Sequence, residues 1–445
     1  MSKGSPSGPP PRRRPQQAKR SKPQPSSGRR EPAAKKIAHV AAAGTRAAAH
    51  KADKAAKASD QRGAGATSHQ DAAITTLSSQ FEIFLMCAPG LESVLAAEVK
   101  ELGFEAVKPV AGGVTITGGW PEVWRANFEV RGAGRVLVRI GAFRAFHLAQ
   151  LDKRARRLPW AAVLRPDVPF RVEATCKSSR IYHSGAAAER IERAVVDELG
   201  CPCAADAEVM IKARIEDDLC TISIDTSGEL LHKRGHKEAV AKAPMRETMA
   251  ALFLRQCGYA GREPVLDPMC GSGSFVIEAA EIAAGLKPGR ARRFAFELLA
   301  TFDAAAWQRL SAPPPPIDPG FRCYGSDRDA GAVAMSRANA ERAGVADLTA
   351  FTQAPVSAIT APEGPPGLVI VNPPYGTRIG DKTGLERLYR ALGETLKSRF
   401  SGWRVGLVTS DAALARATGL PFEPTAAPVL HGGLRVKLFK TRTLP

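Results

Sequence analysis

The stretch that decides the fold is Val265-Leu266-Asp267-Pro268-Met269-Cys270-Gly271-Ser272-Gly273-Ser274-Phe275-Val276-Ile277-Glu278-Ala279. Its first two residues are typical of the end of a buried strand, and the apolar spacing from Phe275 onward predicts a helix. Gly271 and Gly273 lie between them, so we expect a tight turn that brings the N–H groups of a helix N-terminus close to a ligand. Small loops in α/β proteins also use glycine simply for turning, so this loop alone does not establish a binding site.

Two further strands are predicted to end beside this loop. Residues 322–326 lead into Asp327, which precedes a helical pattern over residues 330–343. An acidic residue at this point of a parallel sheet is where the ribose hydroxyls of a cofactor are usually held. Residues 367–371 are almost wholly apolar and lead into Asn372-Pro373-Pro374-Tyr375. Because ligands of open α/β sheets bind beyond the carboxyl ends of the strands, we expect all three segments to share one crevice.

The tetrapeptide at residues 372–375 separates the candidate cofactors. Dinucleotide dehydrogenases have no use for it, whereas Asn-Pro-Pro-Tyr resembles the signature of class I methyltransferases that act on exocyclic amino groups of bases. The resemblance implies an α/β, Rossmann-like sheet with S-adenosyl-L-methionine as cofactor. Carried over onto this chain, it assigns the methionine end of the cofactor to Asp267, Gly271, Gly273 and Ser274, and the ribose to Asp327.

The chemistry of an exocyclic amine explains why such a tetrapeptide is needed. The amine is a poor nucleophile because its lone pair is delocalised into the ring. The Asn372 side-chain oxygen and the Pro373 carbonyl can each accept one N–H, which aims the lone pair at the sulfonium methyl group. Two prolines keep the loop stiff, and Tyr375 can stack on a flipped base. The candidate catalytic residues are therefore Asn372, Pro373, Pro374 and Tyr375, and no metal is required.

The charge of the chain is unevenly distributed. Its 445 residues are 44% hydrophobic and carry a net charge of +19, enough for two or three domains with real cores. Residues 1–72 hold 16 Lys or Arg and four Asp or Glu, so +12 of that charge lies at the start of the chain. Residues 1–78 also contain too little apolar surface to fold, and we interpret them as a disordered, RNA-seeking arm. A tail that serves only solubility is the alternative.

The cysteines and apolar runs indicate the compartment. The eight cysteines form neither a disulfide framework nor a spacing typical of zinc sites, which predicts reduced thiols and no metal. No apolar run is long enough to span a bilayer, and the first thirty residues lack a signal core. We therefore expect a cytoplasmic protein with no membrane partner. Cys270 is interpreted as a small packing residue rather than a nucleophile.

Two α+β modules are predicted before the glycine loop. In residues 79–145 we expect strands and helices over residues 81–87, 91–102, 104–110, 113–116, 120–128 and 135–140. In residues 146–232 we expect a basic helix around residues 153–157, followed by elements over residues 170–174, 185–199, 208–215 and 219–224. The second module carries a basic cluster that can contact phosphates, although a solvated face explains it equally well. Its members are Lys177, Arg180, His183 and Arg190.

The order of these parts extends the resemblance. Cys87-Ala88-Pro89-Gly90-Leu91-Glu92, Lys233-Arg234-Gly235-His236 and the Asp267 loop follow one another as in bacterial THUMP-containing RNA methyltransferases. The chain most resembles the 23S ribosomal RNA guanine-N2 methyltransferase group, whose older label is N6-adenine-specific DNA methylase. The resemblance implies a disordered tail at 1–78, a ferredoxin-like domain at 79–145, a THUMP RNA-binding domain at 146–232 and a methyltransferase domain at 233–445. The implied substrate is 23S rRNA or a ribosome assembly intermediate.

One departure and three alternatives remain open. Relatives commonly place an Asp after the third strand to bind adenine, whereas this chain has Gln353-Ala354-Pro355-Val356, so Gln353 or a backbone carbonyl is expected to replace that contact. A tRNA guanine-N2 methyltransferase shares both modules, and the insertion with the arginines of residues 290–293, which are expected to touch RNA, favours rRNA. A DNA adenine-N6 methyltransferase would not need the THUMP-like module. A non-catalytic RNA-binding assembly factor would not need the intact loop, Asp327 and Asn372.

Overall fold

The computed structural model describes residues 79–238, 245–313, 315, 317–375, 382–424, 427–431 and 433–445. All of them belong to one compact unit, Gly65–Pro445. The arm predicted for residues 1–78 lies outside the described residues. In the described part of the chain, no helix combines the length and apolarity needed to cross a membrane.

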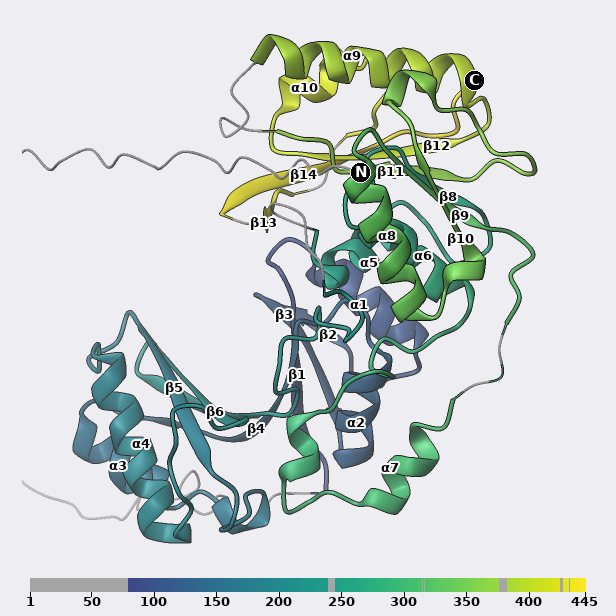
Figure 1. Ribbon diagram of the computed structural model, residues 1–445. Coiled ribbons are helices and arrows are strands. Elements are labelled where there is room, and N and C mark those ends of the chain that lie inside the picture. The colour runs from purple at the N-terminus through teal and green to yellow at the C-terminus, as the bar shows by residue number, and fades with distance from the viewer. Residues whose placement is uncertain are drawn as a thin grey trace, which may run out of the picture. The chain divides into compact units, whose positions relative to one another are not determined.

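The first sheet has seven strands in the order β2-β3-β1-β4-β7-β6-β5 (Figure 1). Only β5 and β6 run parallel, and the other neighbours are antiparallel. The strands are β1 Phe81–Met86, β2 Lys108–Val110, β3 Gly113–Gly118, β4 Arg135–Arg144, β5 Phe170–Lys177, β6 Val209–Glu216 and β7 Leu219–Asp225. Its helices are α1 Glu92–Glu101, α2 Trp120–Glu129, α3 Leu148–Ala155, η1 Trp160–Ala162 and α4 Ser184–Leu199.

Two details of this sheet differ from the sequence prediction. Strand β4 is ten residues long and pairs with both β1 and β7, so one sheet runs through the boundary expected at residue 145. The strand expected over residues 104–110 begins only at Lys108. Phe104 is buried beneath the turn after α1, and Ala106 has a left-handed φ of 51°, so this segment cannot be extended.

The second sheet also has seven strands, in the order β10-β9-β8-β11-β12-β14-β13. The strands are β8 Val265–Asp267, β9 Cys323–Asp327, β10 Thr349–Gln353, β11 Leu368–Val371, β12 Arg404–Thr409, β13 Val429–His431 and β14 Leu434–Lys440. The first five in spatial order are parallel, and β14 pairs antiparallel with β12 and β13. This is the predicted Rossmann-like sheet, and it ends in an antiparallel hairpin of β13 and β14. Residues 368–371 are fully buried, as expected for a central parallel strand.

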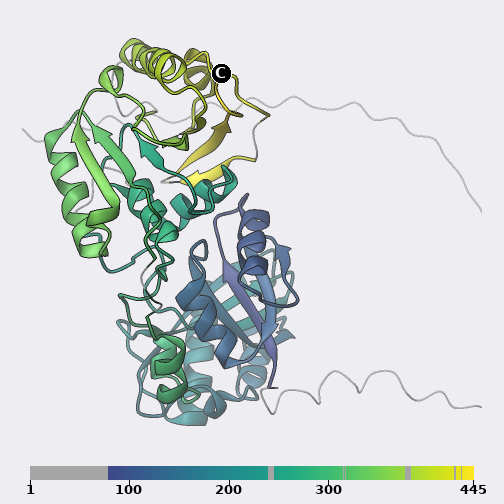
Figure 2. The ribbon, with the colours of Figure 1, turned by 90° about the vertical axis from the view of Figure 1, so that its right-hand side faces the viewer.

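Helices cover both faces of the second sheet (Figures 1 and 2). Helices α5, α6 and α8 lie on one face, and α9 and α10 lie on the other. The helices of this part are α5 Glu247–Gln256, α6 Ser274–Ala283, η2 Ala295–Leu298, α7 Ala304–Leu310, α8 Ala330–Ala343, η3 Ala346–Leu348, η4 Val356–Ala358, α9 Lys382–Arg399 and α10 Ala412–Ala417. Met249 of α5 and Met245, two residues before the helix, are both buried in the core.

A buried ion network fixes helix α6 against the N-terminal module. Arg131 pairs with Glu278 at 2.8 Å and with Glu281 at 3.4 Å, and both carboxylates are on α6. Glu98 of α1 accepts hydrogen bonds from the backbone N–H groups of Arg131 and Gly132. Because α6 begins directly after the glycine loop, this network also holds the loop in place.

Candidate active site

Three adjacent strands bring the predicted site residues to one edge of the sheet. Asp267 ends β8 and pairs in register with Gly325 of β9, two residues before Asp327. Strand β11 lies on the other side of β8, and Asn372 follows it directly. Since β8, β9 and β11 are parallel, Asp267, Asp327 and Asn372 all lie at carboxyl ends, where ligands of such sheets bind.

The glycine loop between β8 and α6 needs both of its glycines, for different reasons. Gly271 and Gly273 have φ angles of 55° and 83°, in the left-handed region that other residues rarely adopt. A Cβ at Gly273 would approach Ile277 and Ser336 to 3.1 and 3.2 Å, so Gly273 permits close helix packing. A Cβ at Gly271 would meet nothing within 4 Å. Gly271 therefore borders open space in which a ligand can approach the backbone.

The two acids at this edge have different environments. Asp267 is 3% exposed and accepts a hydrogen bond from the Met269 N–H at 3.0 Å. Burial, with a smaller contribution from Asp327, raises the pKa of Asp267 to about 8. Asp327 accepts the N–H groups of Gly271 at 3.1 Å and Asp329 at 3.0 Å, which ties two loops together. A buried carboxyl with so high a pKa is suited to receive a cation, because a cation would stabilise its ionised form.

The hydroxyl of Ser274 already has partners within the protein. It accepts a hydrogen bond from Lys237 Nζ at 2.6 Å and donates one to the Met245 carbonyl at 3.1 Å. Lys237 also pairs with Glu247 at 2.9 Å. The first residue of α6 is thus tied to the start of α5, and a contact between Ser274 and the cofactor stays a prediction.

Asn372 carries the most informative atom of the site. Its Oδ1 is buried and has no hydrogen-bond partner among the residues that the structure describes. Leaving a buried acceptor unsatisfied costs about 1–3 kcal/mol, so such atoms are rare in folded proteins. Within the described residues this oxygen is therefore free, at the edge where ligands of parallel sheets bind.

The rest of the tetrapeptide is held from behind by a residue that the sequence did not indicate. Tyr389 of α9 is fully buried, and its hydroxyl reaches the Pro374 carbonyl at 3.3 Å and Thr409 Oγ1 at 3.2 Å. Tyr375 is half-buried, and burial raises its pKa to about 12. Helical periodicity places Tyr389 on the buried face of its helix, but nothing local predicts that its hydroxyl contacts the tetrapeptide.

The segment after β10, where adenine is expected to bind, carries Gln353 in place of the Asp that relatives commonly have. Gln353 ends β10 beside Asp327, in register with it. Its Nε2 donates to the Arg328 carbonyl at 3.2 Å, and the Ala354 N–H donates to the Asp327 carbonyl. The segment after β10 therefore borders the loop that carries Asp327, without a carboxylate.

The predicted RNA-binding cluster lies on the β5–α4 segment of the first sheet. Lys177 and Arg180 are largely exposed, and acids lie beside them: Glu216 at 2.7 Å from Lys177 and Asp218 at 3.7 Å from Arg180. Arg180 also stacks over the Phe146 ring at 4.7 Å. His183 caps α4 by accepting the Ala186 N–H, and Arg190 is half-buried. The four residues share one segment, but none is at the strand ends that carry the glycine loop.

The described ranges contain no group of three or more His, Cys, Asp or Glu side chains arranged to hold a metal ion. Cys270 is buried in the glycine loop, and burial raises the pKa of its thiol, as expected for a packing residue.

Comparison with known proteins follows the same division of the chain. Residues 234–431 match the family model of the RMKL-like methyltransferase domain, and residues 82–137 match that of the RlmL ferredoxin-like domain. A Synechocystis sp. protein provisionally named an RNA methyltransferase is 32% identical over 373 residues, which cover 80% of this chain and 95% of that protein.

Two further relatives match over most of the chain. The ribosomal RNA large subunit methyltransferase K/L of Psychromonas ingrahamii is 32% identical over 352 residues, or 76% of this chain. That match covers 47% of the relative, so this chain spans about half of its length. The solved structure of SMU.472, provisionally named a methyltransferase and complexed with SAH, superposes with a TM-score of 0.76 at 27% identity, covering 83% of this chain and 100% of that one.

Proposed function

The chain belongs to the family of RlmL-like RNA methyltransferases, and we propose that it methylates the exocyclic N2 amine of a guanine in 23S ribosomal RNA. The observation that carries this proposal is the buried Oδ1 of Asn372, which has no partner among the described residues. An amine N–H is the complementary donor for such an oxygen.

The cofactor of the family is S-adenosyl-L-methionine, and the residues at the crevice fit it. When bound, it supplies the electrophilic methyl group. We assign its ammonium group to Asp267, whose buried carboxyl has no cation beside it among the described residues, and its ribose hydroxyls to Asp327. Each oxygen of Asp327 already accepts one N–H but keeps a further lone pair. The open space beside Gly271 admits the methionine portion against the backbone.

The catalytic loop acts on the amine. Asn372 Oδ1 accepts one N–H of the amine and the Pro373 carbonyl accepts the other, which fixes the orientation of the nitrogen lone pair. Tyr389 holds the Pro374 carbonyl, so the loop does not need to reorganise when the base enters. The half-buried ring of Tyr375 offers a face on which the flipped base can stack.

The assignment of 23S rRNA as the substrate rests on the names of the relatives rather than on the geometry of the crevice. One relative is named a ribosomal RNA large subunit methyltransferase, and another is named as acting on RNA. The guanine N2 position follows from the resemblance of the tetrapeptide and the module order, which a tRNA guanine-N2 methyltransferase would share.

The test is methyl transfer from labelled S-adenosylmethionine to separated RNA fractions of a strain lacking the gene, followed by nucleoside analysis. We expect N2-methylguanosine in 23S rRNA with the wild-type protein. Label in tRNA would show that the chain is instead a tRNA methyltransferase. Label as N6-methyladenosine would overturn the assignment of the amine.

A further inference from the structure

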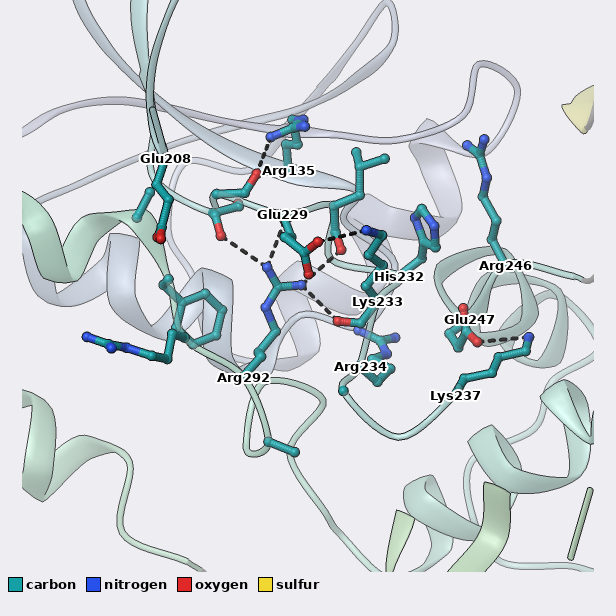
Figure 3. Close-up of a pocket in the computed structure, with 18 of the residues that line it drawn as sticks. Arg135, Glu208, Glu229, His232, Lys233, Arg234, Lys237, Arg246, Glu247 and Arg292 are labelled. Atoms are coloured by element: carbon teal, nitrogen blue, oxygen red, sulfur yellow. Dashed lines mark hydrogen bonds and ion pairs between the residues drawn. The ribbon is translucent and has the colours of Figure 1, made fainter. Parts of the chain in front are cut away.

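A large basic cavity lies beside the catalytic crevice (Figure 3). Its volume is about 1290 Å³, and it is lined by residues of segment 227–237, by the start of α5, by residues 291–295 and by His431. Pockets for small molecules are typically roughly 300–1,000 Å³. The size of this cavity favours a segment of a polymer over a single small ligand.

Cations outnumber acids in its lining. Eight are Arg or Lys and four are Asp or Glu. Two of the four acids are neutralised: Glu229 by Lys233 at 2.7 Å and Glu247 by Lys237 at 2.9 Å. The other two, Asp206 and Glu208, come from the segment before β6. Figure 3 shows Glu208 at one end of the cavity and Arg246 at the other.

Arg292 is the fixed charge at the centre of the cavity. Its two terminal nitrogens donate to four backbone carbonyls, those of Ser227, Glu229, Leu230 and Lys233. It makes no ion pair with a carboxylate within the described ranges, and its Nε has no partner there. Burial, followed by the nearby charge of Arg234, lowers the pKa of Arg292 to about 10. Glu229 and Asp225 act on this cation only from a distance, so a bound anion would be its direct partner.

Arg246 and His431 form the end of the cavity that faces the methyltransferase sheet. Arg246 has an exposed side chain with no hydrogen bond or ion pair to any described residue. His431 is 7% exposed, and neither of its ring nitrogens has a partner in the described part of the chain. Burial and then the charges of Arg246 and Lys237 lower the pKa of His431. Both side chains offer unused hydrogen-bonding capacity toward a ligand.

This end of the cavity is directly connected to the cofactor loop. Lys237 lines the cavity, yet its Nζ donates to Ser274 Oγ at 2.6 Å, and Ser274 is the first residue of α6 after Gly273. One side chain therefore separates the basic cavity from the loop assigned to the methionine end of the cofactor.

From these contacts we propose that the cavity binds the phosphate backbone of the RNA strand that flanks the target nucleotide, with Arg246 as a direct phosphate ligand. The proposal rests on the proposed function, because it takes RNA as the substrate. Arginine is suited to this role, since its planar guanidinium binds two phosphate oxygens at once. Arg292 contributes a fixed positive charge. Asp206 and Glu208 repel phosphate groups, which places the strand nearer to Arg246.

The test compares Arg246→Gln and the double variant Arg246→Gln/Arg293→Gln with Arg416→Ala. The Arg293 side chain is 83% exposed, and Arg416 is an exposed arginine of α10 outside the cavity, so folding should survive all three changes. Binding of transcribed 23S rRNA is measured over a series of salt concentrations, together with the affinity for S-adenosylhomocysteine. Loss of one charged phosphate contact weakens RNA binding by about tenfold and lowers the salt-dependence slope by about 0.7.

We expect that loss for Arg246→Gln, a larger one for the double variant, and wild-type values for Arg416→Ala, with unchanged cofactor affinity throughout. A wild-type protein that neither binds nor methylates RNA would overturn the proposed function itself. A wild-type protein that does both, alongside an Arg246→Gln variant with the same RNA affinity and the same slope, would overturn only the assignment of the cavity.

Discussion

Two buried carboxyl groups, one on each side of the glycine loop, have pKa values shifted in opposite directions. Glu281 of α6 is fully buried, and burial alone would raise its pKa, but Arg290 and Arg131 lower it. Asp267 of β8 is almost as buried, has no cationic partner within the described ranges, and its pKa is raised to about 8. The difference is the countercharge. Arginines of the protein supply it for Glu281, whereas we propose that the ammonium group of the cofactor supplies it for Asp267.

Amides show the same contrast. Asn127 is buried, and both ends of its side chain are bonded: Nδ2 donates to Val123 and Thr226, and Oδ1 accepts from Ser227. Asn372 Oδ1 is buried without any partner in the described part of the chain. Asn127 is thus satisfied within the fold, whereas we propose that the substrate amine completes the hydrogen bonding of Asn372.

The largest expected effect is the difference in the free energy of unfolding between Glu281→Gln and Asp267→Asn. Glu281→Gln leaves Arg131 and Arg290 with less countercharge, so the free energy of unfolding should fall by about 3–5 kcal/mol. Asp267→Asn should instead raise it at pH 7, by up to about 4 kcal/mol, because the buried carboxyl stays protonated there whereas the same carboxyl ionises in the unfolded chain, and the neutral amide removes this cost. Urea unfolding of the two variants measures both values. Equal losses would mean that Asp267 also has a structural countercharge.

The pH dependence of cofactor affinity tests whether the cofactor supplies the missing countercharge of Asp267. If the ammonium group binds the ionised form of Asp267, binding below its pKa of about 8 must release a proton. Affinity for S-adenosylhomocysteine should then rise between pH 6 and pH 7.5, by up to about tenfold per pH unit. Calorimetry in buffers of different ionisation enthalpy also counts the released proton. In Asp267→Asn the affinity should be weaker and nearly independent of pH. A flat profile in the wild-type protein would contradict the role of Asp267.

Tyr389→Phe should give the smallest effect. It removes the hydroxyl that reaches the Pro374 carbonyl, at a cost of about 0.5–1.5 kcal/mol, so the methyl-transfer rate should fall by about three- to tenfold. Tyr259→Phe is the matched control, because that buried hydroxyl donates to the Ala279 carbonyl away from the catalytic loop. The control should lose stability but keep the rate. Single-turnover transfer to 23S rRNA measures the rates, and equal rates in both variants would remove Tyr389 from the loop's support.

The sequence predicted the parts of the site that follow from local patterns. Apolar runs located β8, β9 and β11, and the residues at their ends follow because parallel strands end at one edge of a sheet. Contacts between distant segments leave no such pattern. The ion pair between Arg131 and Glu278 spans 147 positions, and the hydrogen bond from Lys237 to Ser274 spans 37.

The continuous first sheet was missed for a related reason. Residues 141–144 complete β4 and pair with β7, but alternation alone did not show that the strand continues past residue 140. Among the arginines of residues 290–293, Arg290 binds Glu281 and Arg292 binds backbone carbonyls, whereas Arg293 is largely exposed, and their contact with RNA stays a prediction. Only the fold distinguishes an arginine used inside the protein from one facing solvent.

The central claim is that the open oxygen of Asn372 is reserved for the substrate amine. The most direct test measures the single-turnover rate of methyl transfer to 23S rRNA and the free energy of unfolding for Asn372→Ala and Asn127→Ala. We predict that Asn372→Ala transfers about 100- to 1,000-fold more slowly without losing stability. Asn127→Ala should lose about 1–3 kcal/mol of stability and keep its rate. An Asn372→Ala protein that transfers methyl groups at the wild-type rate would contradict the claim.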